Sequence, residues 1–249
     1  MLTPRNRVLL VFTWFRLYWC YTELMLIFGV NESYVSRELH HIVPIIHWVY
    51  RLEIRWPSKQ TRALLEGTLA DVDDKAIGSM DFTITPRQHS LARDENFYRG
   101  DKGVPFLNNF AVADFRGLWF DFEAGFQGHA ADQRSFILSN VGKGDCPLSK
   151  KQKLLADGGF STTDQRVLTP NKTDERSRIH KANRCGIENT FRDYKIFRSV
   201  GEVSRHSPAF QALYVSTIAR VSNHLWRKRL ANGLAVFDVL NSEIGVIKQ

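Results

Sequence analysis

The sequence has little cysteine and no closely spaced cysteine pair. Cys20, Cys146 and Cys185 lie far apart and form no CxxC motif. This spacing supports neither a zinc ribbon nor a framework of disulfides. We therefore expect a reducing, intracellular compartment, which is the nucleus in a eukaryote and the cytoplasm in a bacterium.

Long uninterrupted apolar runs are also missing. Two arginines precede an apolar run at residues 8–15, as in a signal peptide, but the run ends at Arg16 without a small-residue cleavage site. Extending it to spanning length would place Arg16 and Glu23 inside a bilayer, where each is costly. We expect neither secretion nor membrane insertion. Internal repeats and low-complexity tracts are absent as well.

Positive charge is what the chain has in excess. The net charge is +8, and 43% of the 249 residues are hydrophobic, enough for a core. Residues 172–229 contain thirteen basic and five acidic residues, so this stretch accounts for the whole excess. Such a balance favours a polyanionic partner, nucleic acid first, although a charge-rich solvated helix is the alternative.

The first 56 residues read as a small all-α domain. Thr3 and Pro4 start a helix that should run to about Trp19. A short helix at residues 22–28 should end at Gly29, and a third should begin at residue 32 and end or kink where Pro44 follows Val43. The break at residues 56–58 marks the expected boundary with a second domain, residues 57–249.

A short helix, a glycine turn and a second helix form the pattern of a helix-turn-helix. If Val35, Leu39 and Ile42 face inward, polar side chains suited to phosphates and bases face outward. These are Ser33, Tyr34, Ser36, Arg37 and His40. The pattern fits equally well an ordinary three-helix unit that contacts no DNA.

A helical stretch follows residue 57 and runs to about residue 69, after which the periodicity changes. The remainder predicts an α/β fold. We expect strands at residues 80–85, 110–113, 118–124, 154–156 and 167–168. Helices should cover residues 132–138, about 172–194 and 208–230, with an exposed loop at 143–151.

Three carboxylates stand where they could meet. Asp81 interrupts a strand of β-forming residues, Asp157 ends an apolar strand before two glycines, and Glu188 lies on a helix beside apolar residues. Together they would form an all-oxygen site for two divalent ions, Mg²⁺ or Mn²⁺, suited to phosphoryl transfer. Each alone is more simply a solvated acid. Near Glu188 lie three basic residues that could bind a DNA backbone: Arg184, Arg192 and Lys195.

Asp132 is a fourth acid of interest. Its simplest role is the N-cap of a helix that starts at Gln133. A place at the edge of the metal site is the less certain alternative.

An ordered set of motifs resembles the Harbinger-like DDE superfamily endonucleases. The motifs are Gly78–Asp81, Phe97–Lys102, Gly125–Asp132, Leu154–Phe160 with Thr169-Pro170, and Ile187–Lys195. The resemblance implies an RNase H-like mixed sheet flanked by helices, preceded by the helix-turn-helix, and catalytic carboxylates at Asp81, Asp157 and Glu188. Phe82 replaces a residue that is usually small, Phe160 stands where tyrosine is common, and Arg99 and Asp101 interrupt the tyrosine-glycine-lysine segment.

The sequence thus predicts a transposase that binds double-stranded DNA, at element ends and target, as a homo-oligomer, and cleaves and transfers strands. No membrane and no small-molecule substrate is expected. One alternative is a domesticated DNA-binding regulator or adaptor that has lost catalysis, and another is a metal nuclease of the same fold.

Overall fold

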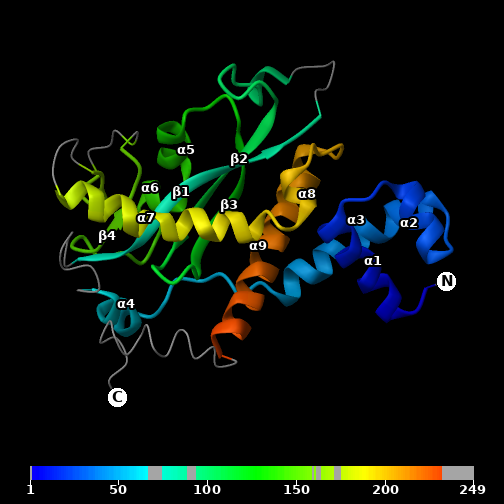
Figure 1. Cartoon of the computed structure of the whole chain (residues 1–249), viewed down its shortest axis with the longest axis horizontal. Coiled ribbons are helices and arrows are strands. Elements are labelled where there is room, and N and C mark those ends of the chain that lie inside the picture. Colours follow the sequence, from blue (N-terminus) through cyan, green and yellow to red (C-terminus); the bar gives the residue numbers. More distant parts are fainter. Residues whose placement is uncertain are drawn as a thin grey trace.

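A computed structural model describes residues 2–66, 75–88, 94–158, 160, 164–170 and 175–231. A central sheet is covered by helices on both faces, and the three N-terminal helices lie beyond one side of it (Figure 1). Residues 67–69 and 172–174, included in two predicted helices, lie outside the described residues.

The sheet has five strands in the order β3-β2-β1-β4-β5. β1 (Ala76–Pro86), β2 (Phe106–Ala113) and β3 (Trp119–Gln127) are antiparallel neighbours, while β4 (Lys153–Leu155) and β5 (Val167–Leu168) run parallel to β1. This mixed sheet flanked by helices confirms the predicted RNase H-like α/β fold. β1 and β2 are longer than predicted. Their extra residues are almost all buried, so these residues lack the alternation of apolar and polar side chains by which a strand is predicted from sequence.

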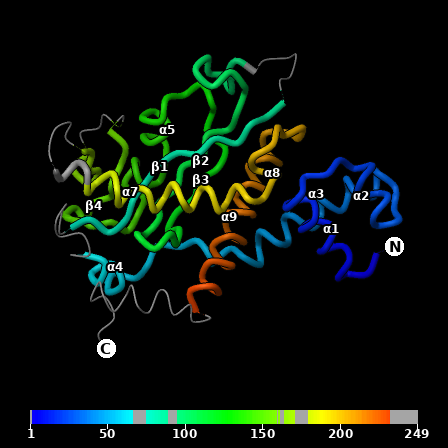
Figure 2. The backbone as a smooth tube through the Cα atoms, viewed as in Figure 1, coloured from blue at the N-terminus to red at the C-terminus, as the bar shows by residue number. Residues whose placement is uncertain are grey.

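Each face of the sheet has its own hydrophobic core. On one face, α4 (Lys59–Leu65), α5 (Asp132–Leu138) and α6 (Asn140–Lys143) pack on residues such as Met80 and Phe110. On the other face lie α7 (Glu175–Tyr194), α8 (Arg198–Gly201) and α9 (Pro208–Ala231) (Figure 2). α7 crosses the sheet over β1, so its side chains can meet those of the central strand.

The N-terminal helices form largely as their capping residues predict. α1 (Pro4–Leu17) starts at Thr3, whose hydroxyl accepts from the Asn6 N–H, and α2 (Tyr21–Phe28) ends at Gly29, which has φ +63°. α3 (Glu32–Val49) starts at Asn31, which caps it. The expectation that Pro44 ends α3 near residue 43 is wrong, and the helix continues to residue 49. Pro44 lies on the exposed side, while the buried face on both sides of it holds the helix together.

These helices share a core with the C-terminal helices. Trp14 of α1 packs against Phe210 and Tyr214 of α9, and the His40 ring of α3 stacks on Phe210 with the ring centroids 4.0 Å apart. Ser199 of α8 donates a hydrogen bond to a main-chain carbonyl of α1. The division at residue 56 therefore stays a prediction, because the two regions bury apolar side chains in one cluster.

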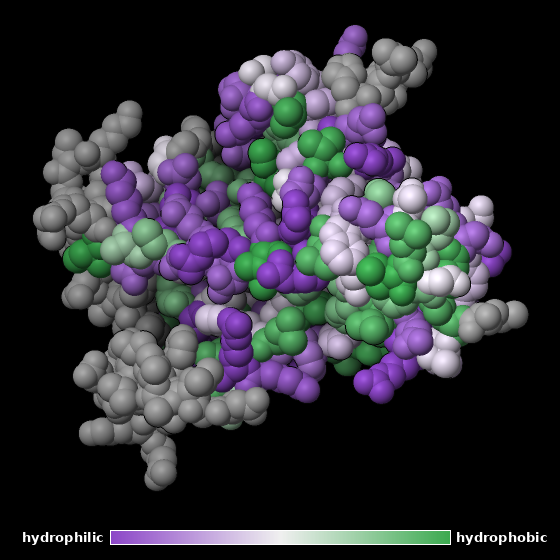
Figure 3. All heavy atoms as spheres, turned by 45° about the vertical axis from the view of Figure 1, so that its right-hand side comes forward, coloured by the Kyte–Doolittle hydropathy of each residue, from purple (hydrophilic) through white to green (hydrophobic). Residues whose placement is uncertain are grey.

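Figure 3 shows apolar side chains gathered over the N-terminal helices, on the right of that view, and polar side chains across the middle. The exposed apolar residues of this region include Leu26 (73% exposed) and Trp48 (63%). None of the helices in the described part of the chain is long and apolar enough to cross a membrane.

Candidate active site

Asp81 stands on the central strand, beside the close approach of β1 and β2. A Cβ at Gly78 would overlap the carbonyl oxygen of Ala113, so the strands can lie this near only with glycine there. The Asp81 side chain is half-buried and accepts from the Phe82 N–H at 2.8 Å. Burial raises the pKa of Asp81, and the charge of Arg184 opposes that rise.

Asp157 follows the strand next to β1. β1 and β4 run parallel, with Gly78 opposite Leu154 and Ser79 opposite Leu155, so two residues further on Asp157 comes beside Asp81. The negative charge of Asp157 adds to the raised pKa of Asp81, which indicates the same proximity. The Asp157 side chain is exposed. The predicted meeting of these two acids at one sheet position thus follows from the strand order.

A buried histidine of α7 forms a hydrogen bond with the main chain just after β4. His180 lies 2.9 Å from the carbonyl oxygen of Ala156, the residue before Asp157. A carbonyl only accepts, so the Nε2 atom of His180 carries the proton and donates it. The residue was not among those predicted for the site. Its signal was the spacing of His180, Arg184 and Glu188, four residues apart on one face of a helix.

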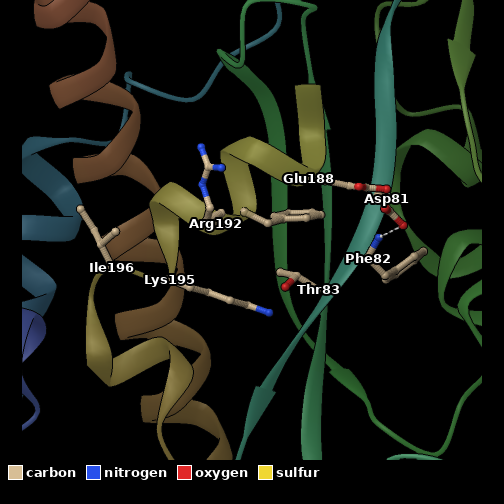
Figure 4. Close-up of a pocket in the computed structure, with 8 residues that line it drawn as sticks. Asp81, Phe82, Thr83, Glu188, Arg192, Lys195 and Ile196 are labelled. Carbon is tan, nitrogen blue, oxygen red and sulfur yellow. Dashed lines mark hydrogen bonds between the residues drawn. The ribbon is translucent and has the colours of Figure 1, made fainter. Parts of the chain in front are cut away.

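Glu188 is positioned by the apolar stripe of α7. Ile187, Phe191 and Tyr194 are buried against the sheet, as their spacing predicts. Glu188, next to this stripe, is exposed, and its carboxylate points toward Asp81 (Figure 4).

Arg184 joins the two acids. Its Nη1 atom donates to Oδ2 of Asp81 at 2.7 Å, and its Nη2 atom donates to Oε1 of Glu188 at 2.7 Å. Only 14% of the Arg184 side chain is exposed. Carboxylates from the central strand and from α7 thus converge on one cation.

A cavity of about 660 Å³ opens beside the two acids. It is lined by Asp81, Phe82, Thr83, Glu188, Phe191, Arg192, Lys195 and Ile196. In Figure 4 the Lys195 side chain extends toward Thr83, while Arg192 points away from the strand. Burial lowers the pKa of the Lys195 ammonium, and the Arg192 guanidinium lies near Asp193. Two of the three predicted backbone-binding residues therefore line the cavity, and the third, Arg184, is engaged inside the site.

The fit of a divalent ion depends on donor chemistry and on spacing. Asp81, Asp157 and Glu188 supply only oxygen donors, which suits Mg²⁺ or Mn²⁺, and the shared guanidinium shows that two of them converge on a positive charge. Within the described residues, no group of three or more His, Cys, Asp or Glu side chains is already gathered for a metal. The residues fit such an ion by their chemistry, and Arg184 holds the position where Asp81 and Glu188 meet.

Asp132 has structural partners of its own. The N-cap of α5 is Ala131, so the predicted capping role of Asp132 is wrong, and Asp132 is the first helical residue. Its carboxylate accepts from the Asn108 amide at 2.8 Å and lies 3.7 Å from Arg99. These contacts tie β2 and the loop before it to α5.

The departures from the family pattern contact one another or their surroundings. The rings of Phe82 and Phe160 stack with centroids 6.0 Å apart, so two unusual aromatics fill one space in the core on the other face of the sheet from α7. Arg99 pairs with Asp101 and with Asp132. Each of these residues therefore has a local partner, and none of these contacts uses the carboxylate of Asp81, Asp157 or Glu188.

The residues predicted to read DNA differ in accessibility. Ser33 and Arg37 are exposed at the start of α3, whereas Tyr34 and Ser36 are half-buried. The Arg37 guanidinium lies over the Tyr34 ring, 5.3 Å from its centroid. His40 is exposed as well, although its ring stacks on Phe210 of α9, so Ser33, Arg37 and His40 are the exposed members of the five.

Comparison with known proteins identifies the family of the chain. Residues 78–223 match the family described as DDE superfamily endonuclease, a range that begins in β1, ends in α9 and includes Asp81, Asp157 and Glu188. No curated protein and no solved structure matches the chain. Because the match extends over more than half of the 249 residues, the chain belongs to the DDE superfamily endonuclease family.

Proposed function

We propose that this protein is a transposase-type endonuclease that binds double-stranded DNA and uses two divalent ions, Mg²⁺ or Mn²⁺, to cleave and transfer strands. The observation that carries the proposal is the convergence of Asp81 and Glu188 on one cation, with Asp157 just after the neighbouring strand. Membership of the endonuclease family supports a nucleic-acid substrate.

Asp81, Asp157 and Glu188 would hold the ions, with Asp132 less certain because Asn108 and Arg99 already engage it. When bound, the ions activate a water or a 3′-hydroxyl and stabilise the leaving oxygen. Lys195 and Arg192 line the same cavity and would neutralise the phosphates on either side of the cut.

Nicking of a supercoiled plasmid tests the catalytic part without knowledge of a target sequence. Asp81→Asn, Asp157→Asn and Glu188→Gln each keep the size of the side chain and remove a charge that a divalent ion needs. We expect nicking to fall by orders of magnitude while DNA binding stays near that of the wild type. Asp193→Asn, on the same helix but outside the cavity lining, is the matched control. Full nicking by Asp81→Asn, or by the wild type in excess EDTA, would refute the metal assignment.

DNA binding by the N-terminal helices is tested at Arg37. If Arg37 contacts a phosphate, Arg37→Ala lowers the affinity for all sequences and reduces the salt slope by about one unit. A base contact would instead cost about 1–3 kcal/mol at one position of the site. Arg5→Ala, an exposed charge on α1, controls for the loss of charge in the same region. Unchanged affinity for Arg37→Ala and Ser33→Ala would show that these helices only pack.

The competing function is a DNA-binding adaptor of the same fold without catalysis. The pairing of both acids with Arg184 favours it, since an arginine in that place also suits a site that no longer binds metal. An adaptor predicts DNA binding without metal-dependent nicking. A nuclease without transposition predicts nicking without joining of a 3′ end to target DNA.

Self-association on DNA completes the proposal, in the nucleus or cytoplasm according to the source. Its support is the exposed apolar surface of the N-terminal helices, which includes Leu26 and Trp48. Light scattering with and without DNA measures the mass of the complex. We expect the Leu26→Ser, Trp48→Ser double variant to lower that mass, and an unchanged mass would count against this surface.

A further inference from the structure

We propose that Arg184 is a tethered counter-cation of the active site, which holds Asp81 and Glu188 together in the absence of metal and must release both before divalent ions bind. Arg184 therefore sets the metal affinity of the protein. The inference rests on the proposed function, because it assumes that these carboxylates are the metal ligands.

The geometry is that of an inserted cation. The two terminal nitrogens of one planar guanidinium each donate to a different carboxylate at 2.7 Å, one on β1 and one on α7. Charge-assisted hydrogen bonds of this kind are short and strong, and the rigid fork of arginine fixes both at once.

A second pair in the same chain shows what is unusual. Arg198 and Glu202 have the same i, i+4 spacing as Arg184 and Glu188, but the Arg198 side chain is 56% exposed. Such a surface pair contributes little. Arg184 is only 14% exposed and has an added partner in Asp81, 103 residues away in the chain.

Competition follows from the atoms that are used. A divalent ion would need the oxygens that accept from Arg184, Oδ2 of Asp81 and Oε1 of Glu188, at distances near 2.0–2.1 Å for Mg²⁺. A guanidinium and a divalent ion on the same oxygens repel each other strongly at this range, so the binding of one disfavours the other. Without the guanidinium, the negative charges of Asp81, Glu188 and the neighbouring Asp157 repel one another, and a divalent ion relieves that repulsion.

Manganese binding to the DNA-free protein tests the inference directly. Mn²⁺ binding is measured by calorimetry, or by the loss of the free-ion signal in electron paramagnetic resonance, for the wild type, Arg184→Gln and Arg198→Gln. Arg198 is the matched control, since it has the same i, i+4 pair with a glutamate but lies outside the cavity lining. We expect Arg184→Gln to bind Mn²⁺ about tenfold more tightly or better, given the strength of hydrogen bonds between charged groups, and Arg198→Gln to stay within about twofold of the wild type.

Melting temperature gives an independent readout. Arg184→Gln should melt below the wild type in EDTA and recover with saturating Mg²⁺, so that its rise in melting temperature exceeds that of the wild type. If Arg184→Gln fails to fold, Arg184→Lys carries the test, because it keeps the charge, loses the two-pronged contact and should show an intermediate gain in affinity.

The possible outcomes distinguish failure of this inference from failure of the proposed function on which it rests. Mn²⁺ binding that is abolished by Asp81→Asn but equal or weaker in Arg184→Gln overturns the counter-cation and leaves the metal site standing. An Arg184→Gln variant that loses only DNA affinity makes Arg184 a phosphate ligand, which also overturns it. Binding that is absent from all variants, or insensitive to Asp81→Asn, overturns the proposed metal site itself.

Discussion

Phe210 links the N-terminal helices to the rest of the protein, and its removal should destabilise both. The ring lies near the start of α9 and is nearly buried. It stacks on His40 of α3 at 4.0 Å and on Trp14 of α1 at 6.4 Å, and meets Tyr214 edge-on at 5.8 Å. Phe210→Ala therefore removes one ring from contacts among three helices.

The magnitude follows from the size of the side chain. Truncation of a buried phenylalanine to alanine costs about 3–5 kcal/mol. That is a large part of the roughly 5–15 kcal/mol by which native proteins are stable. For a chain of this length, each kcal/mol shifts the melting temperature by about 2–4 °C, so the expected drop is roughly 6–20 °C.

Urea unfolding followed by two signals checks this prediction. Tryptophan fluorescence reports on Trp14 among other tryptophans, and far-ultraviolet circular dichroism reports on the whole chain. We expect both signals to move together to lower urea in Phe210→Ala. Leu225→Ala, on the same helix but at an exposed position, should change stability by no more than about 0.5 kcal/mol. Two separate transitions, only one of which moves, would refute the shared core and support independently folded domains divided near residue 56.

Two further predictions concern stability. Burial raises the pKa of Glu123 from 4.5 to about 7, so between these pH values the native state binds more protons than the unfolded state, and the stability that this group contributes falls as pH rises. Glu123→Gln keeps an oxygen for the Asn140 N–H and should flatten that slope. We expect its free energy of unfolding at pH 8 to rise by about 1–2 kcal/mol, after allowance for partial exposure. Urea unfolding of both proteins at pH 5 and pH 8 measures the difference, and the same pH dependence in both would contradict the prediction. Gly78→Ala should destabilise by about 1–3 kcal/mol because its Cβ would meet the Ala113 carbonyl, whereas Gly100→Ala, with open space around it, should not. Thermal melts of the two variants compare them, and equal melting temperatures would count against the close approach of β1 and β2.

Local signals predicted the elements that depend on local chemistry. Thr3, Asn31 and Gly29 set the helix ends that their side chains or backbone freedom favour. The α7 stripe was readable because one face of it is buried. Pro44 and Asp132 were misread for a common reason. A proline in a helix and an aspartate near a helix start have usual effects, but burial on both sides of Pro44 and the contacts of Asp132 with Asn108 and Arg99 decided otherwise.

The candidate active site shows what the sequence alone could not predict. Asp157 could be placed beside Asp81 as soon as the strand order was known, because parallel strands carry their residues forward together. The hydrogen bond between Arg184 and Asp81 could not be predicted in this way. On the sequence, Arg184 with Glu188 and Arg198 with Glu202 are the same i, i+4 pattern, and both predict a solvated helix surface equally well.

What separates the two arginines is the strand beneath α7. α7 contacts β1, and that packing brings Asp81 to the Arg184 guanidinium, whereas Arg198 pairs with Glu202 and lies half in solvent. From the sequence, Arg184 was predicted to bind DNA because its positive charge predicts an anionic partner. The charge alone does not tell which anion that partner is. A backbone phosphate and two carboxylates attract a guanidinium in the same way. Only the tertiary position of Asp81 shows that Arg184 already has its anions within the protein, and any role for Arg184 with DNA therefore requires it to leave them first.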